Sequence, residues 1–185
     1  MTSKAFQPPE YLVITQTDDW ILSHRVDTAL PGYLMLGAKA PGKQLAAMSP
    51  RALSQLGLLM AAAQEALEAV LSPKHLYIGR YGHGAGYSLH FHIIPVCDWV
   101  IGSFFADPRY RYLESLQTPG CGGTDGADWA DGADLTLYIW RVFCESPDPP
   151  SIPGPSIGEV IERLRAVWRV QEVAVPARPD KPAAD

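Results

Sequence analysis

Short apolar stretches punctuate the first half of the chain and predict β-strands. Candidate strands are YLVITQ (11–16), WILSHRV (20–26), PGYLMLGAK after its Pro-Gly turn (31–39) and HLYIGRY (75–81). The first, second and fourth are rich in β-branched and aromatic residues, which suit a pleated and half-buried surface, and the third is an apolar run. A fifth candidate, YSLHFHIIPV (87–96), follows a glycine-rich bend. This half of the chain therefore predicts a sheet.

Between the third and fourth candidate strands the apolar spacing changes to that of a helix. Ser49 supplies an N-cap and Pro50 suits the first helical turn. The positions that would face the core are Leu53, Leu56, Met60, Ala63, Leu67 and Val70. They recur three to four residues apart, so we expect a long helix that ends near Leu71 and covers the sheet.

The second half gives weaker signals. The segment LTLYIWRVF (135–143) alternates and predicts a strand, whereas CDWVIGSFF (97–105) fits a strand or a loop. The glycine-rich acidic stretch 118–134 predicts a flexible loop. Ser156 and Glu159 form a capping box before an apolar stripe, which predicts a final helix.

These elements divide the chain into four parts. We expect an N-terminal arm at 1–9, a core domain at 10–97, a C-terminal extension packed on the core at 98–171 and a disordered tail at 172–185. A chain of 185 residues is long enough for one well-packed domain.

Composition narrows the possible partners. The formal net charge of −5 argues against a protein that holds long nucleic acid, which requires a broad basic face. Three cysteines without CxxC spacing, Cys97, Cys121 and Cys144, predict reduced thiols rather than a disulfide framework. The N-terminus lacks an apolar leader, and no apolar run approaches the ~20 residues of a membrane span. We therefore expect a cytoplasmic protein without membrane contacts.

The stretch SLHFHIIPV carries the candidate chemistry. In a strand, Ser88, His90 and His92 share one face while the apolar residues between them share the other. The preceding glycines at 82, 84 and 86 allow main-chain N–H groups to turn toward phosphate oxygens. One neutral imidazole can then attack phosphorus, and the second can donate a hydrogen bond to a phosphate oxygen.

By itself, a His-x-His pair leaves other interpretations open. Two histidines on a strand are often only exposed side chains. A zinc site is a further alternative, with Cys97 and His83 as the nearest additional ligands.

The same stretch resembles the motif of the histidine-triad family, His-φ-His-φ-His-φ-φ followed by proline, where φ is apolar. Ser88 stands in place of the first histidine, and the other positions match. Upstream, VDTALPGYLMLGAK is similar to the family's aspartate-containing segment that leads into a Pro-Gly-His turn. A long helix, a strand and a glycine bend follow in the same order, so the resemblance covers about 10–97.

The resemblance implies an α+β fold in which an antiparallel sheet of about five strands packs against the long helix. The extension would add a strand and a helix. It also implies that two protomers pair and that a small nucleotide is the substrate. The expected reaction is hydrolysis or nucleotidyl transfer at the α-phosphorus of a dinucleoside polyphosphate or a nucleoside phosphoramidate. No cofactor is required, although a divalent cation can accompany the substrate phosphates.

Residue roles follow from the resemblance position by position. His90 matches the nucleophile that takes the nucleotidyl group, and His92 matches the histidine that contacts a phosphate oxygen. Asp27 is the candidate ribose-binding acid, and Ser88 completes the catalytic set. The remaining nucleotide-binding candidates surround the glycine bend or precede Asp27, and they are Arg80, His83, Gly84, Gly86, His24 and Arg25.

The chain also departs from the family's pattern. Gly84 and Ala85 replace a Gln-Ser/Thr pair, and Tyr33 replaces the histidine of the Pro-Gly-His turn. A hydroxyl at Ser88 cannot carry positive charge, which would slow the reaction by about 10- to 100-fold, or ~1.4–2.8 kcal/mol. Two alternatives therefore remain: a nucleotide sensor or interaction module with weak or no catalysis, and a metal-dependent hydrolase that uses His90, His92 and His83.

Overall fold

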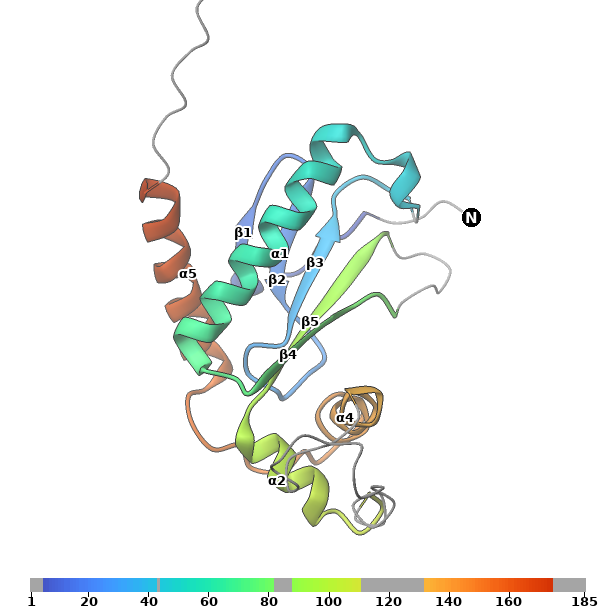
Figure 1. Ribbon diagram of the computed structural model, residues 1–185, viewed down its shortest axis with the longest axis vertical. Helices are drawn as coiled ribbons and strands as arrows, with labels where there is room; N and C mark the ends of the chain where they lie inside the picture. Colours follow the sequence, from blue (N-terminus) through green and yellow to red (C-terminus); the bar gives the residue numbers. More distant parts are fainter. Residues whose placement is uncertain (1–4, 43, 82–87, 111–131, 175–185) are drawn as a thin grey trace, which may run out of the picture.

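A five-stranded antiparallel sheet forms the centre of the protein (Figure 1). The computed structural model describes residues 5–42, 44–81, 88–110 and 132–174, the last five without their side chains. The strands are β1 (Val13–Gln16), β2 (Trp20–His24), β3 (Leu34–Ala38), β4 (His75–Gly79) and β5 (His90–Val96). They lie in the order β1-β2-β3-β5-β4. The predicted α+β class and its antiparallel sheet are confirmed.

The long helix α1 (Pro50–Leu71) connects β3 to β4 and covers one face of the sheet (Figure 1). Its start is fixed by Ser49, whose hydroxyl oxygen accepts a hydrogen bond from the Ala52 N–H at 3.1 Å. It ends at Ser72, which adopts the left-handed conformation. The predicted helix and its N-cap are confirmed.

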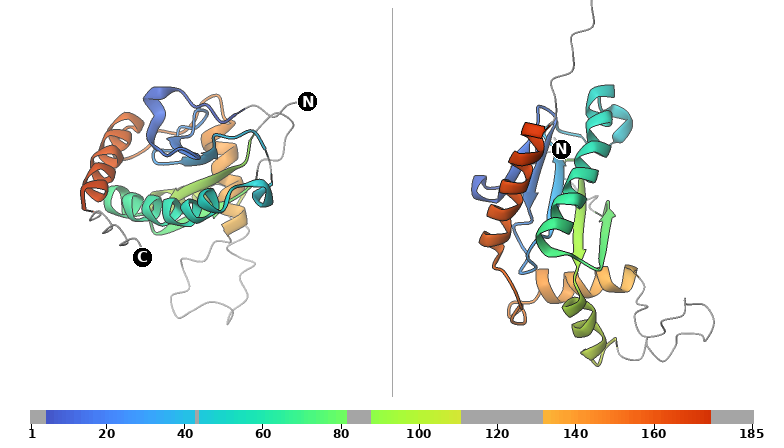
Figure 2. Two further views of the ribbon diagram at one scale, coloured as in Figure 1. Left: turned by 90° about the horizontal axis from the view of Figure 1, so that it is seen from above. Right: turned by 60° about the vertical axis from the view of Figure 1, so that its left-hand side comes forward.

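The final helix, α5 (Ile157–Ala174), packs beside α1 on the same side of the sheet (Figure 2). Its predicted capping box is present, because the Glu159 N–H donates to the Ser156 hydroxyl and the Ser156 N–H donates back to the Glu159 carboxylate at 2.8 Å. The helix continues to Ala174, beyond residue 172, where we expected the disordered tail to begin.

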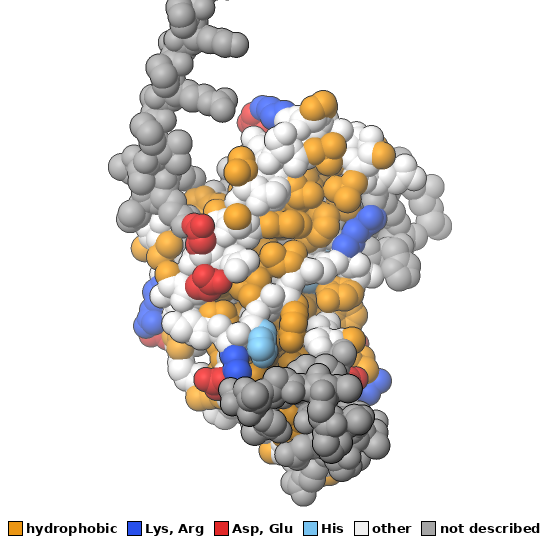
Figure 3. All heavy atoms as spheres, viewed as in Figure 1, with side chains coloured by type: hydrophobic (Ala, Val, Ile, Leu, Met, Phe, Trp, Pro, Cys, Tyr) orange, Lys and Arg blue, Asp and Glu red, His pale blue; other side chains and the backbone are white. Residues whose placement is uncertain are grey.

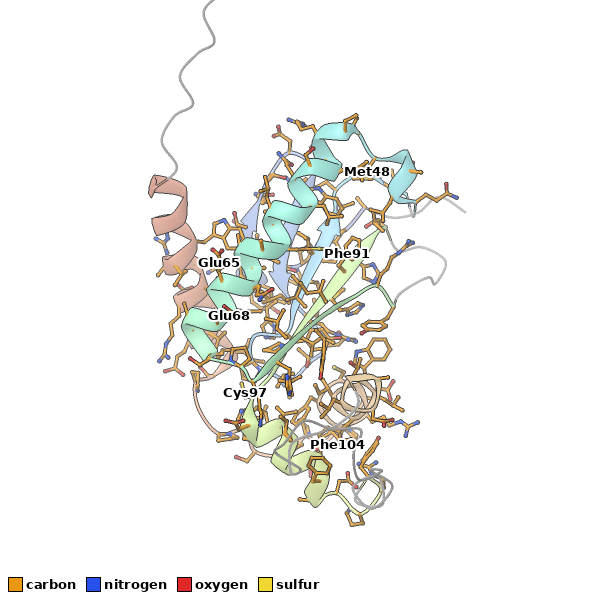
Figure 4. All side chains as sticks on the ribbon, viewed as in Figure 1. Met48, Glu65, Glu68, Phe91, Cys97 and Phe104 are labelled. Carbon is orange, nitrogen blue, oxygen red and sulfur yellow. The ribbon has the colours of Figure 1, made fainter. Side chains whose placement is uncertain are left out.

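Strand register sorts the side chains onto two faces. Leu36 pairs with Phe91, and both lie on the α1 side, whereas Met35 pairs with His92 on the opposite side. The α1-side cluster also contains Trp20, Leu22, Leu34, Ala63, Leu67, Ile93, Leu164 and Trp168. Figure 4 labels Phe91, which packs against this cluster beside α1.

The extension is helical where a strand was predicted. Residues 132–144 form α4 (Gly132–Ile139) and a π-helical turn, η3 (Trp140–Cys144). The prediction was wrong because the buried residues Leu135, Tyr138, Ile139 and Phe143 follow a helical period, while Leu137 is exposed. Likewise, α2 (Asp98–Ala106) replaces the strand or loop expected at 97–105. These helices pack a second apolar cluster against the lower part of the face that carries His92.

Several predictions fall outside the described residues: Cys121, most of the loop 118–134, and the tail after Ala174. Of the N-terminal arm, residue Phe6 packs onto Gly37 of β3. Within the described residues, no helix is long and apolar enough to cross a membrane. Figure 3 shows hydrophobic side chains over the upper part of α1, where Leu53 and Leu58 are exposed.

Candidate active site

His90 and His92 lie together on the face of β5 that turns away from α1. Their partners in β3 are Gly37 and Met35, so the strand ladder fixes both rings on one side of the sheet. The two ring centroids are 5.2 Å apart. Both side chains are buried, with 8% of His90 and 5% of His92 exposed. The structure therefore brings the two predicted catalytic histidines into one site.

The protonation of His90 follows from its backbone contact. Its Nδ1 lies 2.9 Å from the carbonyl oxygen of Ser88. A carbonyl oxygen only accepts hydrogen bonds, so the Nδ1 of a neutral His90 carries the proton. The lone pair of the imidazole is then on Nε2, the atom that a nucleophilic histidine needs.

Ser88 contributes to this arrangement through its backbone rather than through a visible side-chain bond. The residue is buried, and its hydroxyl oxygen has no hydrogen-bond partner within the part of the chain that the structure describes. A buried hydroxyl without a partner is unfavourable, and native proteins seldom keep one without a reason. Its position next to His90 makes a bound ligand a reasonable partner.

Three aromatic rings surround His92. Tyr81, Trp140 and Tyr33 have centroids 5.4, 5.7 and 5.8 Å from the imidazole. Burial, together with the nearby His90 and Arg25, lowers the pKa of His92 to about 3, against the opposing effect of Asp27. His92 is therefore a neutral imidazole at physiological pH.

Arg25 and Asp27 lie at the edge of the group of aromatic rings that surrounds His92. Arg25 binds the Asp27 carboxylate with two hydrogen bonds, Nε to Oδ1 at 2.6 Å and Nη2 to Oδ2 at 3.1 Å. This contact holds the pKa of Asp27 below its ordinary value, against the opposing effect of burial. The guanidinium also donates from Nη1 to the Tyr33 hydroxyl at 3.0 Å and lies over the rings of Tyr33 and Trp140. Both predicted residues thus reach the site, as a pair.

Of the other predicted binding residues, His24 lies away from the site. By strand alternation, His24 shares the α1 face with Leu22, and only 1% of it is exposed. Its Nδ1 lies against the Arg25 carbonyl oxygen, so His24 is a buried structural residue. Arg80 is exposed, one residue after Gly79, which pairs with His92. The remaining candidates, His83, Gly84 and Gly86, lie outside the described residues.

Cys97 cannot share a metal ion with His90. The two residues flank opposite ends of β5, about 23 Å apart at the rise of a strand. The described residues contain no group of three or more histidine, cysteine or acidic side chains that could hold a metal. The alternative third ligand, His83, is not among those residues.

Comparison with known proteins identifies the fold. No protein-family model matches the sequence, and no curated protein matches it. A Zn-bound histidine triad family protein from Mycobacterium smegmatis is 11% identical over 89% of this chain and 88% of that chain, with a TM-score of 0.50. A Hit-like protein involved in cell-cycle regulation from Bartonella henselae is 15% identical over 84% of this chain and 85% of that chain, with a TM-score of 0.47.

The chain has the histidine-triad fold. At this level of sequence identity the likeness concerns the fold, while the chemistry depends on the residues present here. Within the histidine-triad fold this chain places two residues that sequence reasoning did not assign to the site. The sequence marks Tyr33 only as a departure from the family's pattern, and it assigns Trp140 no role in the site. No local sequence pattern connects Trp140 with His92, because Trp140 lies 48 positions later in the chain.

Proposed function

We propose that this protein is a nucleotide hydrolase or nucleotidyltransferase that forms a covalent intermediate on His90. The substrate class would be a dinucleoside polyphosphate or a nucleoside phosphoramidate, attacked at the α-phosphorus. The observation that carries the proposal is the bond from His90 Nδ1 to the Ser88 carbonyl oxygen, because it leaves the imidazole lone pair on Nε2.

The proposed reaction has two displacements. In the first, the Nε2 lone pair of His90 forms a bond to the α-phosphorus, and the bond from phosphorus to the leaving group breaks. The leaving group departs with that electron pair. In the second, water attacks the same phosphorus, the P–N bond breaks, and the electron pair returns to His90 as the water proton is released. If an alcohol or a second phosphate replaces water, the result is nucleotidyl transfer.

The remaining residues of the site would serve the phosphate. His92 lies beside His90 and would donate a hydrogen bond to a non-bridging oxygen as negative charge develops in the transition state. The Ser88 hydroxyl would donate a second. Arg25, paired with Asp27, would add positive potential at the edge of the site. Such donors can replace a metal ion, so the proposal requires no cofactor.

We predict that His90→Ala abolishes turnover and leaves the fold intact. The variant removes the nucleophile, and its small cavity lies at the ligand face rather than in the α1-side cluster. Release of product from a fluorogenic adenosine phosphoramidate and from a dinucleoside polyphosphate measures turnover, and circular dichroism checks the fold.

His75→Ala is the matched control, because His75 lies on β4 and stacks on Tyr77 outside the site. This variant should keep activity. Undiminished turnover by His90→Ala would contradict the proposal, as would turnover that depends on a metal ion retained by the protein after dialysis.

A second candidate function is a nucleotide-binding sensor with little or no catalysis. Ser88 favours it, because a hydroxyl replaces an imidazole beside the nucleophile and cannot become cationic. This candidate predicts that a nucleoside monophosphate raises the melting temperature while no substrate of either class is turned over. The same thermal-shift measurement on His90→Ala shows whether binding and chemistry share one site.

A further inference from the structure

The hydroxyl of Tyr33 is the meeting point of three side chains. The Nη1 of Arg25 lies 3.0 Å from it, the indole Nε1 of Trp140 2.7 Å, and the Nδ1 of His92 3.0 Å. These groups come from different parts of the chain: Arg25 follows β2, Tyr33 precedes β3, Trp140 begins η3 and His92 lies in β5. Tyr33 itself is fully buried, with 0% exposed.

The roles of these groups can be worked out by counting donors. The guanidinium of arginine and the indole N–H of tryptophan can only donate hydrogen bonds. They occupy the two acceptor positions of the Tyr33 oxygen. The hydroxyl proton is then left for the third partner, the Nδ1 of His92, which must accept it. A neutral imidazole that accepts at Nδ1 carries its own proton on Nε2.

We propose that Tyr33 is a positioning residue that holds the proton of His92 on Nε2, so that His92 meets the substrate as a hydrogen-bond donor. Arg25 and Trp140 act through Tyr33, because together they direct its hydroxyl proton toward His92. Asp27 in turn fixes Arg25 with two hydrogen bonds. The result is a chain of hydrogen bonds that runs from an exposed carboxylate to the buried imidazole.

Two further observations support this assignment. The pKa of His92 is lowered to about 3, so the ring does not carry protons on both nitrogens at neutral pH. Burial also raises the pKa of Tyr33 to about 12. The hydroxyl therefore stays protonated at neutral pH and can donate its hydrogen bond to His92. In addition, Trp140 begins a π-helical turn, a distortion that is frequent at functional sites and here sets the indole against Tyr33.

The effect of this arrangement on catalysis rests on the proposed function, whereas the assignment of the His92 proton to Nε2 does not. A neutral Nε2–H can donate to a phosphate oxygen without any change of protonation during the reaction. His90 and His92 would then carry their protons on opposite nitrogens, one exposing a lone pair to phosphorus and the other a proton to oxygen. The experiment must therefore measure the tautomer of His92 directly and independently of turnover.

Two-bond proton–nitrogen NMR correlation spectra of ¹⁵N-labelled protein distinguish the two neutral tautomers of histidine. The His92 signals are those missing from the spectrum of His92→Gln. In the wild type at pH 7 we expect His92 to be protonated on Nε2 alone. In Tyr33→Phe, which removes the hydroxyl donor, we expect a mixture of both tautomers.

Tyr110→Phe is the matched control, because it deletes a buried tyrosine hydroxyl that has no hydrogen-bond partner among the described residues. It should leave the His92 signals unchanged. If Tyr33→Phe does not fold, Trp140→Phe provides a second test, because loss of the indole donor frees one acceptor position on Tyr33 and should admit some of the Nδ1-protonated form.

A wild-type His92 protonated on Nδ1 would overturn the proposal, and so would an unchanged tautomer in Tyr33→Phe. An equal change in Tyr110→Phe would also overturn it. If the protein turns over a nucleotide, Tyr33→Phe should lower kcat about tenfold with little change in KM, as for the loss of one hydrogen bond. A wild type that shows the expected tautomer without turnover contradicts the proposed function and leaves the role of Tyr33 in place.

Discussion

The two histidines of β5 differ in what holds them, although they are only two residues apart. His90 donates a hydrogen bond to a main-chain carbonyl oxygen, and His92 accepts one from a tyrosine hydroxyl. A backbone acceptor depends only on the path of the strand, so almost any sequence that forms this strand end supplies it. The tyrosine contact depends on three side chains brought together by the fold. The orientation of His90, the proposed nucleophile, is thus set locally, whereas that of His92 is set by tertiary contacts.

His92 also makes stability depend on pH. The charged and titratable groups around it are His90, Arg25, Asp27 and the tyrosines 33 and 81. Its pKa is lowered from 6.5 to about 3 in the folded protein, mainly by burial. Below pH 6.5 the unfolded chain therefore binds a proton that the folded protein does not. Stability is fully present above that pH and is lost as the solution becomes more acidic.

We predict that this effect lowers the free energy of unfolding by about 2 kcal/mol between pH 7 and pH 5. Urea denaturation at the two pH values measures it in the wild type and in His92→Gln, which lacks the titrating ring. The wild type should lose about 2 kcal/mol more than the variant. His24, whose pKa is also lowered by burial, is present in both proteins and cancels in the difference. An equal loss in both proteins would show that His92 titrates normally.

At the level of elements, one arginine joins α5 to the start of the sheet. The guanidinium of Arg165 donates to the carbonyl oxygen of Val13 from Nε at 2.9 Å and from Nη2 at 2.7 Å. It also donates to the carbonyl oxygen of Tyr11 at 3.1 Å. Val13 begins β1, where the register with β2 shifts, and Tyr11 lies in the 3-10 turn (Glu10–Leu12) just before it. Arg165 therefore ties α5 to the backbone of the segment that enters the sheet.

We predict that Arg165→Leu lowers the free energy of unfolding by about 1.5–3 kcal/mol, the range for hydrogen bonds that involve a charged group. Chemical denaturation measures the change. Arg163→Leu is the matched control, since Arg163 is exposed on the same helix, and it should stay within about 0.5 kcal/mol of the wild type. Similar losses in the two variants would mean that the contacts to β1 contribute little.

The elements also show where pattern reasoning succeeds and where it fails. The bounds of α1 were predictable, because Ser49 caps it and most of its apolar positions follow a helical period, although Leu53, which we expected to face the core, is exposed. The strand prediction for 135–143 was wrong because apolar residues occupy most of its positions. Such a segment fits both the two-residue period of a strand and the 3.6-residue period of a helix. Burial decides the matter, since Leu137 faces out while Leu135 and Tyr138 face in. A short apolar segment does not reveal its own period.

At the level of the whole molecule, the extension is part of the site. Trp140 contacts His92 and Tyr33, and the Ala29 N–H donates to the Phe143 carbonyl oxygen at 2.7 Å. The segment after β5 thus returns to the loop that precedes β3. In Figure 1, α2 and α4 lie together below the end of the sheet, on the side away from the top of α1. The sheet supplies the histidines, and the extension supplies part of their surroundings.

The pairing of two protomers stays a prediction from the family resemblance. The chain has a mass of 20.2 kDa, so light scattering after size-exclusion chromatography should give about 40 kDa. Measurement at several concentrations separates a stable pair from a weak one, because a weak pair dissociates on dilution. A mass near that of the single chain at every concentration would contradict the prediction.

The sequence by itself determined the strands of the sheet, the long helix and the placement of His90 and His92 on one face. Local rules suffice there, because a strand alternates its side chains and a capped helix keeps its period. Only the tertiary structure decided that His24 lies on the α1 face, that Arg25 holds Asp27, and that Trp140 and Tyr33 meet at His92. Contacts between distant segments depend on how the elements pack, and no local pattern in the chain records them.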